Sequence, residues 1–131
     1  LLELHRLPRP DSDKVMYLQH GVMDSSYSFI ANGASDGLAF RAFDKGYDVF
    51  MGNFRGTSGL KHKRGETMPA KDYWDYNLDD HGNFVIYAFI CEIRKVKHRE
   101  LHLRQANMTK EQIEAFNLRK KEGAQQQTTR E

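Results

Sequence analysis

Ser35 lies at the centre of GASDG (residues 33–37), which matches the G-x-S-x-G pattern of the nucleophile elbow in serine hydrolases. Such an elbow needs a buried strand directly before it, which forces the serine into a strained turn, and a helix directly after it. The preceding run FIAN (29–32) is too short and too interrupted to be a central strand. The sequence therefore predicts that Ser35 and Asp36 cap a helix and that Ser35 is not a nucleophile.

His98 and His102 are four residues apart, so a helix would carry both rings on one face, with Glu100 between them in the sequence. Histidine pairs at this spacing can bind a metal ion. However, HRELH differs from the zinc-protease pattern H-E-x-x-H, and the sequence offers no obvious third ligand. We therefore interpret the pair as a solvated helix face and expect no metal site.

Two further groups of candidate residues have simple structural interpretations. Asp79, Asp80 and His81 combine acids with a base, but adjacent side chains rarely converge on one substrate atom. The sequence favours helix-start and loop roles for all three. Cys91 lies in the most apolar stretch of the chain and is interpreted as a buried small residue rather than a reactive thiolate.

The elements that must position these residues alternate between strand and helix up to about residue 96. Apolar and β-branched runs bounded by proline, glycine and acidic turns predict strands at 1–8, 14–19 and 47–52. A helix is expected over 38–43, and Gly46 falls where a left-handed helix stop is expected. This strand–helix–strand unit predicts two neighbouring parallel strands.

The remaining third of the chain reads as helical. The apolar run 84–91 fits either a buried strand or a buried helix, and the helix formers after it favour one helix over 84–104. Thr109 and Gln112 form a capping box for a second helix that should end near Gly123. We expect a hydrolase-like part at 1–95, a helical extension or insertion at 96–122 and a disordered tail at 123–131.

Composition narrows the class of protein. The chain has 131 residues, 39% of them hydrophobic and 29% charged, and a net charge of +2, which gives no strong attraction to nucleic acid. No apolar run approaches the roughly 20 residues that span a bilayer, and no positively charged segment followed by an apolar core has the pattern of a signal peptide. A single cysteine allows no internal disulfide. The first residue is Leu1, so we expect a fragment or a processed piece.

Three segments share an order and a spacing with one known family. They are YLQHGVMDSSYSFIANG (17–33), FDKGYDVFMGNFRGTSGLKHK (43–63) and DYWDYNLDDHG (72–82). From about Leu2 to Ile93 the chain thereby resembles the acid lipase family of α/β-hydrolases, the group of lysosomal acid and gastric lipases and their plant and protist relatives. The resemblance implies a partial α/β-hydrolase fold, with a mostly parallel sheet and a C-terminal helical extension.

The same resemblance implies an oxyanion loop at His20, Gly21 and Val22. In such lipases the backbone N–H of the residue after His-Gly, here Val22, donates to the developing oxyanion. Gly21 would let the backbone turn closely around the substrate. His20 is interpreted as a packing and hydrogen-bonding residue of the loop and not as the general base.

Other positions follow from the family pattern as well. Arg55 is expected to be a structural residue that forms an ion pair or binds a carbonyl group, and Tyr73 and Trp74 are expected to pack on the sheet. Val85 departs from the pattern, because family members often carry Asp there, so any polar contact of that Asp is absent or replaced.

Family chemistry is ester hydrolysis by Ser, His and Asp, with the serine on an elbow after the fifth strand. No strand leading into an elbow follows Ile93. We therefore expect the N-terminal part of a lipase or other carboxylic-ester hydrolase, inactive alone. The alternative is a non-catalytic, hydrolase-like structural or partner-binding subunit.

The resemblance also bears on ligands and partners. It implies a lipid ester substrate for the complete enzyme and neither an organic cofactor nor a metal. A sheet edge left open where the nucleophile strand should pair would invite association. The basic run RKVKHRELHLR (94–104) reads as a surface helix, or as a site that docks to a lipid surface or a partner. Lysosomal, vacuolar or secreted placement follows from family analogy alone.

Overall fold

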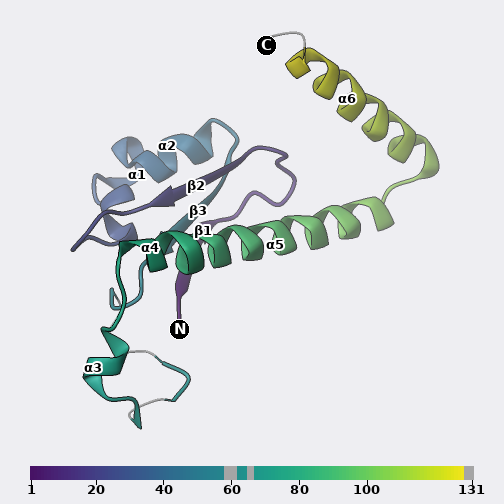
Figure 1. The fold of residues 1–131 in the computed structure, drawn as a ribbon. Coiled ribbons are helices and arrows are strands. Elements are labelled where there is room, and N and C mark those ends of the chain that lie inside the picture. The colour runs from purple at the N-terminus through teal and green to yellow at the C-terminus, as the bar shows by residue number, and fades with distance from the viewer. Residues whose placement is uncertain (58–61, 65–66, 129–131) are drawn as a thin grey trace. The chain divides into compact units, whose positions relative to one another are not determined.

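The computed structural model describes residues 1–57, 62–64 and 67–128, and Figure 1 shows their helices and strands. The chain divides into two compact units, Leu1–Lys97 and His98–Glu131. Within the described ranges, no helix combines the length and the apolar character needed to cross a bilayer.

A three-stranded sheet forms the centre of the first unit. Its strands are β1 (Glu3–Leu7), β2 (Val15–Gln19) and β3 (Asp48–Asn53), in the order β1-β3-β2. β1 runs antiparallel to β3, whereas β2 and β3 run parallel, with Gln19 opposite Gly52. The predicted parallel pairing of the second and third strands is confirmed, and their carboxyl ends meet at one edge of the sheet.

One face of the sheet packs against helix α2 (Leu38–Asp44). Ala39 and Ala42 of this helix form a buried cluster with Val49 and Met51 of β3. Small alanine side chains keep the helix close to the strand, and larger residues from β1 and β2 fill the sides of the cluster. These are Leu7, Met16 and Leu18. Gly46, just after the helix, has φ +88°, the left-handed conformation expected there.

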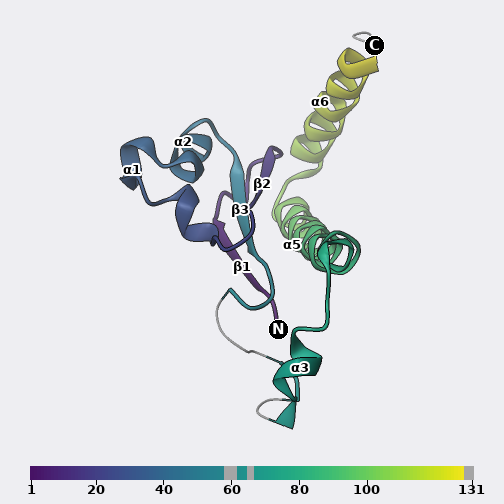
Figure 2. The ribbon, with the colours of Figure 1, turned by 60° about the vertical axis from the view of Figure 1, so that its left-hand side comes forward.

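The opposite face of the sheet is covered by the start of helix α5 (Tyr87–Ala106). Phe89 and Ile93, four residues apart, are buried, and the ring of Phe89 lies 6.1 Å from that of Tyr17 in β2. Figure 2 shows the sheet between α2 on one side and α5 on the other. The first unit therefore has helix, sheet and helix layers, as the α/β prediction requires.

Asp48, the first residue of β3, ties three segments of the first unit together. Its fully buried carboxylate accepts hydrogen bonds from Arg6 (2.8 and 2.6 Å), Lys97 Nζ (2.7 Å) and the Arg9 amide (3.3 Å). Burial by itself raises the pKa of Asp48, but the hydrogen bonds from Arg6, Lys97 and the Arg9 amide outweigh it, and the pKa lies below its ordinary value. The buried group is therefore a paired carboxylate.

The entry into α5 is helical from Leu78 onward. A short turn α4 (Leu78–Asp80) is capped by Asn77, whose side chain accepts from the Asp80 amide at 3.1 Å. A π-helical segment, η3 (His81–Ile86), then leads into α5. The strand-or-helix alternative for 84–91 is thus decided in favour of helix, and Asp79, Asp80 and His81 have the predicted helix-start positions. Val85 is buried.

The predicted cap at Ser35 or Asp36 is wrong. A short helix α1 (Gly33–Asp36) already contains both residues, and α2 is capped by Gly37, whose N–H donates to the Gly33 carbonyl. Ser35 Oγ instead donates to Asp36 Oδ2 at 2.8 Å, on the surface. Helical structure therefore begins at Gly33, earlier than the side-chain pattern predicted, because a backbone hydrogen bond between Gly37 and Gly33 forms this turn. The other short helices are η1 (Ser26–Phe29) and α3 (Ala70–Tyr73).

The second unit contains the end of α5 and helix α6 (Lys110–Thr128). The predicted capping box is confirmed, because Gln112 Oε1 accepts from the Thr109 amide at 2.9 Å and Thr109 Oγ1 from the Gln112 amide at 3.4 Å. The predicted end near Gly123 is wrong, since the helix continues to Thr128. One glycine costs a helix only about 1 kcal/mol relative to alanine, and good helix formers surround it. Residues 129–131 of the expected disordered tail lie outside the described residues.

Candidate functional site

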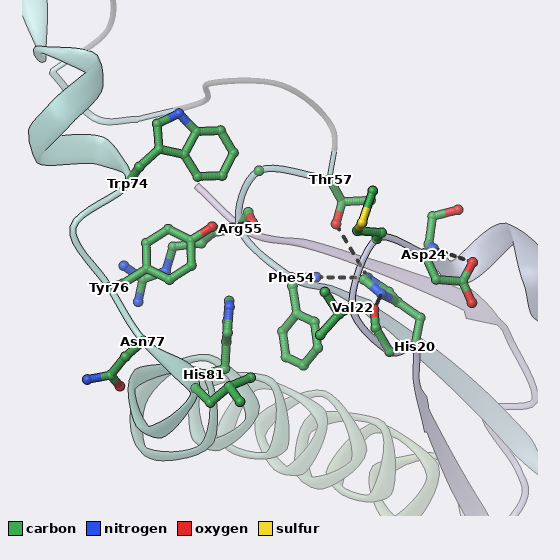
Figure 3. A pocket seen from close by; sticks show the side chains of 15 residues that line it. His20, Val22, Asp24, Phe54, Arg55, Thr57, Trp74, Tyr76, Asn77 and His81 are labelled. Carbon is green, nitrogen blue, oxygen red and sulfur yellow. Dashed lines mark hydrogen bonds between the residues drawn. The ribbon is translucent and has the colours of Figure 1, made fainter.

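A cavity of about 840 Å³ lies where β2 and β3 end (Figure 3). Its walls come from the loop after β2 (20–25), the loop after β3 (54–57), residues of the segment 74–78, and His81. In sheets with parallel strands, ligands bind outside the carboxyl ends of those strands. The residues Gln19 and Gly52, which end the paired register, therefore place both loops at the expected position for a site.

The backbone around Val22 has hydrogen-bonding groups available to a ligand. Val22 lines the cavity with 78% of its surface exposed. Among the described residues, neither its amide nor its carbonyl has a hydrogen-bond partner. Met23, the next residue, is fully exposed and has φ +60°, which is uncommon for a residue other than glycine. The loop thus presents an unused backbone donor at the wall of the cavity.

The side chain of His20 links the loop after β2 to the loop after β3. The ring is 5% exposed, and its Nε2 accepts a hydrogen bond from the Phe54 amide at 3.1 Å. The proton of the neutral ring therefore sits on Nδ1, which donates to the Gly21 carbonyl at 2.7 Å. With both nitrogens engaged in backbone hydrogen bonds, His20 positions the loop.

Within this chain, the backbone conformation at Gly21 does not require a glycine. Its φ lies outside the left-handed region, and a Cβ built on it would meet no atom within 4 Å. The position is open toward the cavity that Gly21 lines.

Aromatic rings form the wall opposite the loop. The ring of His81 lies 4.3 Å from that of Phe54 and 4.9 Å from that of Tyr76, and the Arg55 guanidinium stacks over Tyr76 at 4.4 Å. Tyr76 Oη donates to the Arg55 carbonyl at 3.2 Å. Arg55 itself also lines the cavity. Trp74 lines the cavity, half-exposed, so the expectation that it packs on the sheet is wrong.

Two groups of this wall are shifted toward their neutral forms. Burial, with a smaller contribution from the Arg55 charge, lowers the pKa of His81, and the nearby Asp80 carboxylate only partly opposes the shift. Burial, together with the nearby Tyr73, raises the pKa of Tyr76 against the opposing effect of Arg55. His81 Nδ1 is buried without a hydrogen-bond partner among the described residues.

These groups do not form a catalytic triad. Ser35 is exposed and does not line the cavity. Ser25 lines it, but its Oγ already accepts from the Tyr27 amide at 3.3 Å as the cap of η1. Thr57 Oγ1 lies 3.4 Å from His20 Nε2, which is already the acceptor for Phe54, and Nδ1 of that ring bonds a carbonyl rather than a carboxylate. Within the described part of the chain, no group of three or more His, Cys, Asp or Glu residues could hold a metal.

The chain is similar to lipases over most of its length. It is 39% identical to Lipase member J of Homo sapiens over 77% of the chain, and 36% identical to Lipase lipl-1 of Caenorhabditis elegans over 69%. It is 29% identical to the human gastric triacylglycerol lipase over 78% of the chain. The chain belongs to the acid lipase family.

The chain spans less than a third of the length of each of these relatives. It covers 30% of Lipase member J, 24% of lipl-1 and 28% of the gastric lipase. No protein-family model matches it.

Sequence reasoning named the loop residues 20–22 but missed the aromatic wall. Tyr76 and His81 follow His20 by more than half of the first unit, and only the path through α3 and α4 brings them to the same cavity. The available signal was the aromatic cluster YWDY (73–76) followed at once by a helix cap.

Proposed function

We propose that this chain is the N-terminal part of a lipase or related carboxylic-ester hydrolase that cleaves lipid esters by a Ser-His-Asp mechanism. In this proposal the chain supplies one arm of the oxyanion hole and not the nucleophile. The observation that carries it is the Val22 amide, which has no partner among the described residues and lines a cavity at the carboxyl ends of parallel strands.

The chemistry follows from where charge develops. When a serine attacks an ester carbonyl, negative charge gathers on the carbonyl oxygen, and a fixed N–H aimed at that oxygen needs little reorganisation. Removal of one such donor from a hydrolase typically costs roughly 3–4 kcal/mol of transition-state stabilisation. In the proposal Val22 supplies this donor, and Gly21 leaves room for the substrate beside it.

His20 acts in this proposal as a positioning residue. Its Nε2 bond to the Phe54 amide and its Nδ1 bond to the Gly21 carbonyl fix the loop relative to the end of β3. Neither nitrogen remains to act as a general base. The base, the acid and the nucleophile come from other parts of the complete protein.

The edge of β2 supports this division of the site. β2 pairs with β3 on one side, and no described strand pairs with its other side. A nucleophile-bearing strand placed there would bring its serine to the same end of the sheet as Val22. Residues 1–95 would then form the first part of the hydrolase domain and 96–122 a helical insertion. If the edge stays open, it is where the chain would associate.

Lipid esters are the proposed substrate class. Among the relatives, one is named a triacylglycerol lipase and others are named lipases. Apolar side chains at the cavity suit an acyl chain, among them Val22, Phe54 and Leu78. Contact with a lipid surface belongs to the same proposal.

The coding sequence and a covalent probe test the proposal together. We expect an apolar strand and a G-x-S-x-G or A-x-S-x-G elbow soon after Glu131, and we expect the native gene product to react with a fluorophosphonate and to hydrolyse a triacylglycerol emulsion. The variant S35A should react as the native sequence does. A gene product without an elbow, or one that neither reacts nor hydrolyses, would favour the non-catalytic subunit and overturn the proposal.

A further inference from the structure

His98 and His102 lie on successive turns of α5, inside the second unit, with their rings facing each other. The ring centroids are 4.3 Å apart at an interplanar angle of 74°, and the two Nε2 atoms are 3.3 Å apart. Both side chains are exposed. Among the described residues neither ring has another hydrogen-bond partner, and one Nε2 donates a hydrogen bond to the other.

The separation of the two nitrogens matches a tetrahedral metal ion. Zinc binds imidazole nitrogen at about 2.05 Å, so two such ligands at the tetrahedral angle lie about 3.3 Å apart. Ligands at 90°, as in square-planar or octahedral sites, would lie about 2.9 Å apart at the same bond length. Of these geometries, the observed 3.3 Å fits the tetrahedral one.

We propose that His98 and His102 form a two-histidine site for Zn²⁺ on the exposed face of α5. When the ion binds, the donor ring carries its proton on Nδ1 instead of Nε2, both Nε2 atoms become ligands, and water takes the remaining positions, which the exposure of both rings leaves open. This site is independent of the cavity beside Val22 and does not depend on the proposed hydrolase function.

Each histidine should be essential to this site. Among the described residues no group of three or more His, Cys, Asp or Glu side chains could hold a metal ion, so the site has two side-chain ligands and no third one compensates for a loss. Loss of either ring would leave a single imidazole, which any surface histidine offers. The solvated helix face inferred from the sequence is therefore the metal-free form of a site that the helix has already shaped.

Calorimetric titration of the 131-residue chain with ZnCl₂ tests the proposal. We compare the native sequence with H98Q and H102Q, since glutamine keeps a polar side chain and a good helix propensity. H62Q is the matched control, because His62 is another histidine of the chain and its Nδ1 accepts from the Arg64 amide. Circular dichroism confirms that all four proteins remain equally helical.

The expected result is one Zn²⁺ per chain, an affinity at least tenfold lower in H98Q and in H102Q, and no change in H62Q. Native-like binding in either single variant would overturn the site, as would an equal loss in H62Q. Binding by the native chain that is no tighter than binding by H98Q would overturn it as well.

Discussion

The ring of His20 accepts a hydrogen bond at Nε2 from the backbone amide of Phe54, 3.1 Å away, and so joins the loop after β2 to the loop after β3. The same ring donates from Nδ1 to the Gly21 carbonyl at 2.7 Å and meets the Phe54 ring edge-on at 5.1 Å. One buried side chain thereby sets the conformation of the segment that carries Val22. The loop after β2 is therefore held in place by hydrogen bonds of a buried side chain.

Replacement of His20 should weaken the fold measurably. In H20A the Phe54 amide loses its acceptor in a partly buried setting, and we expect the free energy of unfolding in urea to fall by about 1–3 kcal/mol. H62A removes a histidine elsewhere on the chain and should change that free energy by less than about 0.5 kcal/mol. Equal stability of H20A and the native chain would show that the ring does not hold the loop.

Asp48 should be the most sensitive charged position of the first unit. D48N leaves the Arg6 and Lys97 charges without their buried partner, and loss of one member of a buried ion pair typically costs about 3–5 kcal/mol. D44N, at an exposed aspartate four residues earlier, is the matched control. Should D48N not fold, K97M removes one partner and should give a smaller loss in urea denaturation. An unchanged unfolding midpoint in both D48N and K97M would contradict the role of the network.

The same carboxylate should make stability depend on pH in a defined direction. Because the folded pKa of Asp48 lies below that of the unfolded chain, the unfolded state binds more protons between the two values. The contribution of Asp48 is therefore complete above the unfolded pKa of about 3.9 and is lost as the pH falls from there through the folded pKa. Urea denaturation at a series of acidic pH values should show this loss in the native chain and a flatter profile in K97M. Parallel profiles would disprove the assignment.

Gly52 should not tolerate a side chain. A Cβ there would lie 2.5 Å from Tyr17 Oη, 2.7 Å from Gln19 Oε1 and 2.9 Å from Phe89 Cε2, so three side chains between β3 and α5 must move together. We expect G52A to lower the free energy of unfolding by about 1–3 kcal/mol. G82A is the control, because a Cβ at Gly82 meets nothing within 4 Å in a helical segment. A loss no larger in G52A than in G82A would contradict this packing.

Local signals predicted much of the fold. The three strands, the left-handed Gly46 and the Thr109 capping box were all readable, because each depends on residues within a few positions of one another. The cap of α2 was not readable at Ser35, because backbone hydrogen bonds between Gly33 and Gly37, rather than a side chain, start and end the preceding turn. The end of α6 was misplaced because one glycine is a weak stop among helix formers.

The cavity was only half predictable, for a physical reason. The loop after β2 is a contiguous motif, so a resemblance over residues 20–22 suffices to name it. Tyr76 and His81 line the same cavity because the short helices α3 and α4, with the Asn77 cap, turn the chain toward it. The spacing of residues in the sequence does not reveal the direction of these turns. The pKa shift of His81 likewise depends on burial and on Arg55, which become neighbours only in the folded chain.

The most direct test of the oxyanion role removes one backbone N–H. V22P deletes the proposed donor and keeps an apolar side chain, whereas V22A shortens the same side chain and keeps the donor. In the native gene product, with triacylglycerol or a p-nitrophenyl ester as substrate, we expect kcat to fall about 100- to 1000-fold in V22P and far less in V22A. Equal kcat values for V22P and V22A, with both proteins folded, would contradict the assignment of Val22 as an oxyanion donor.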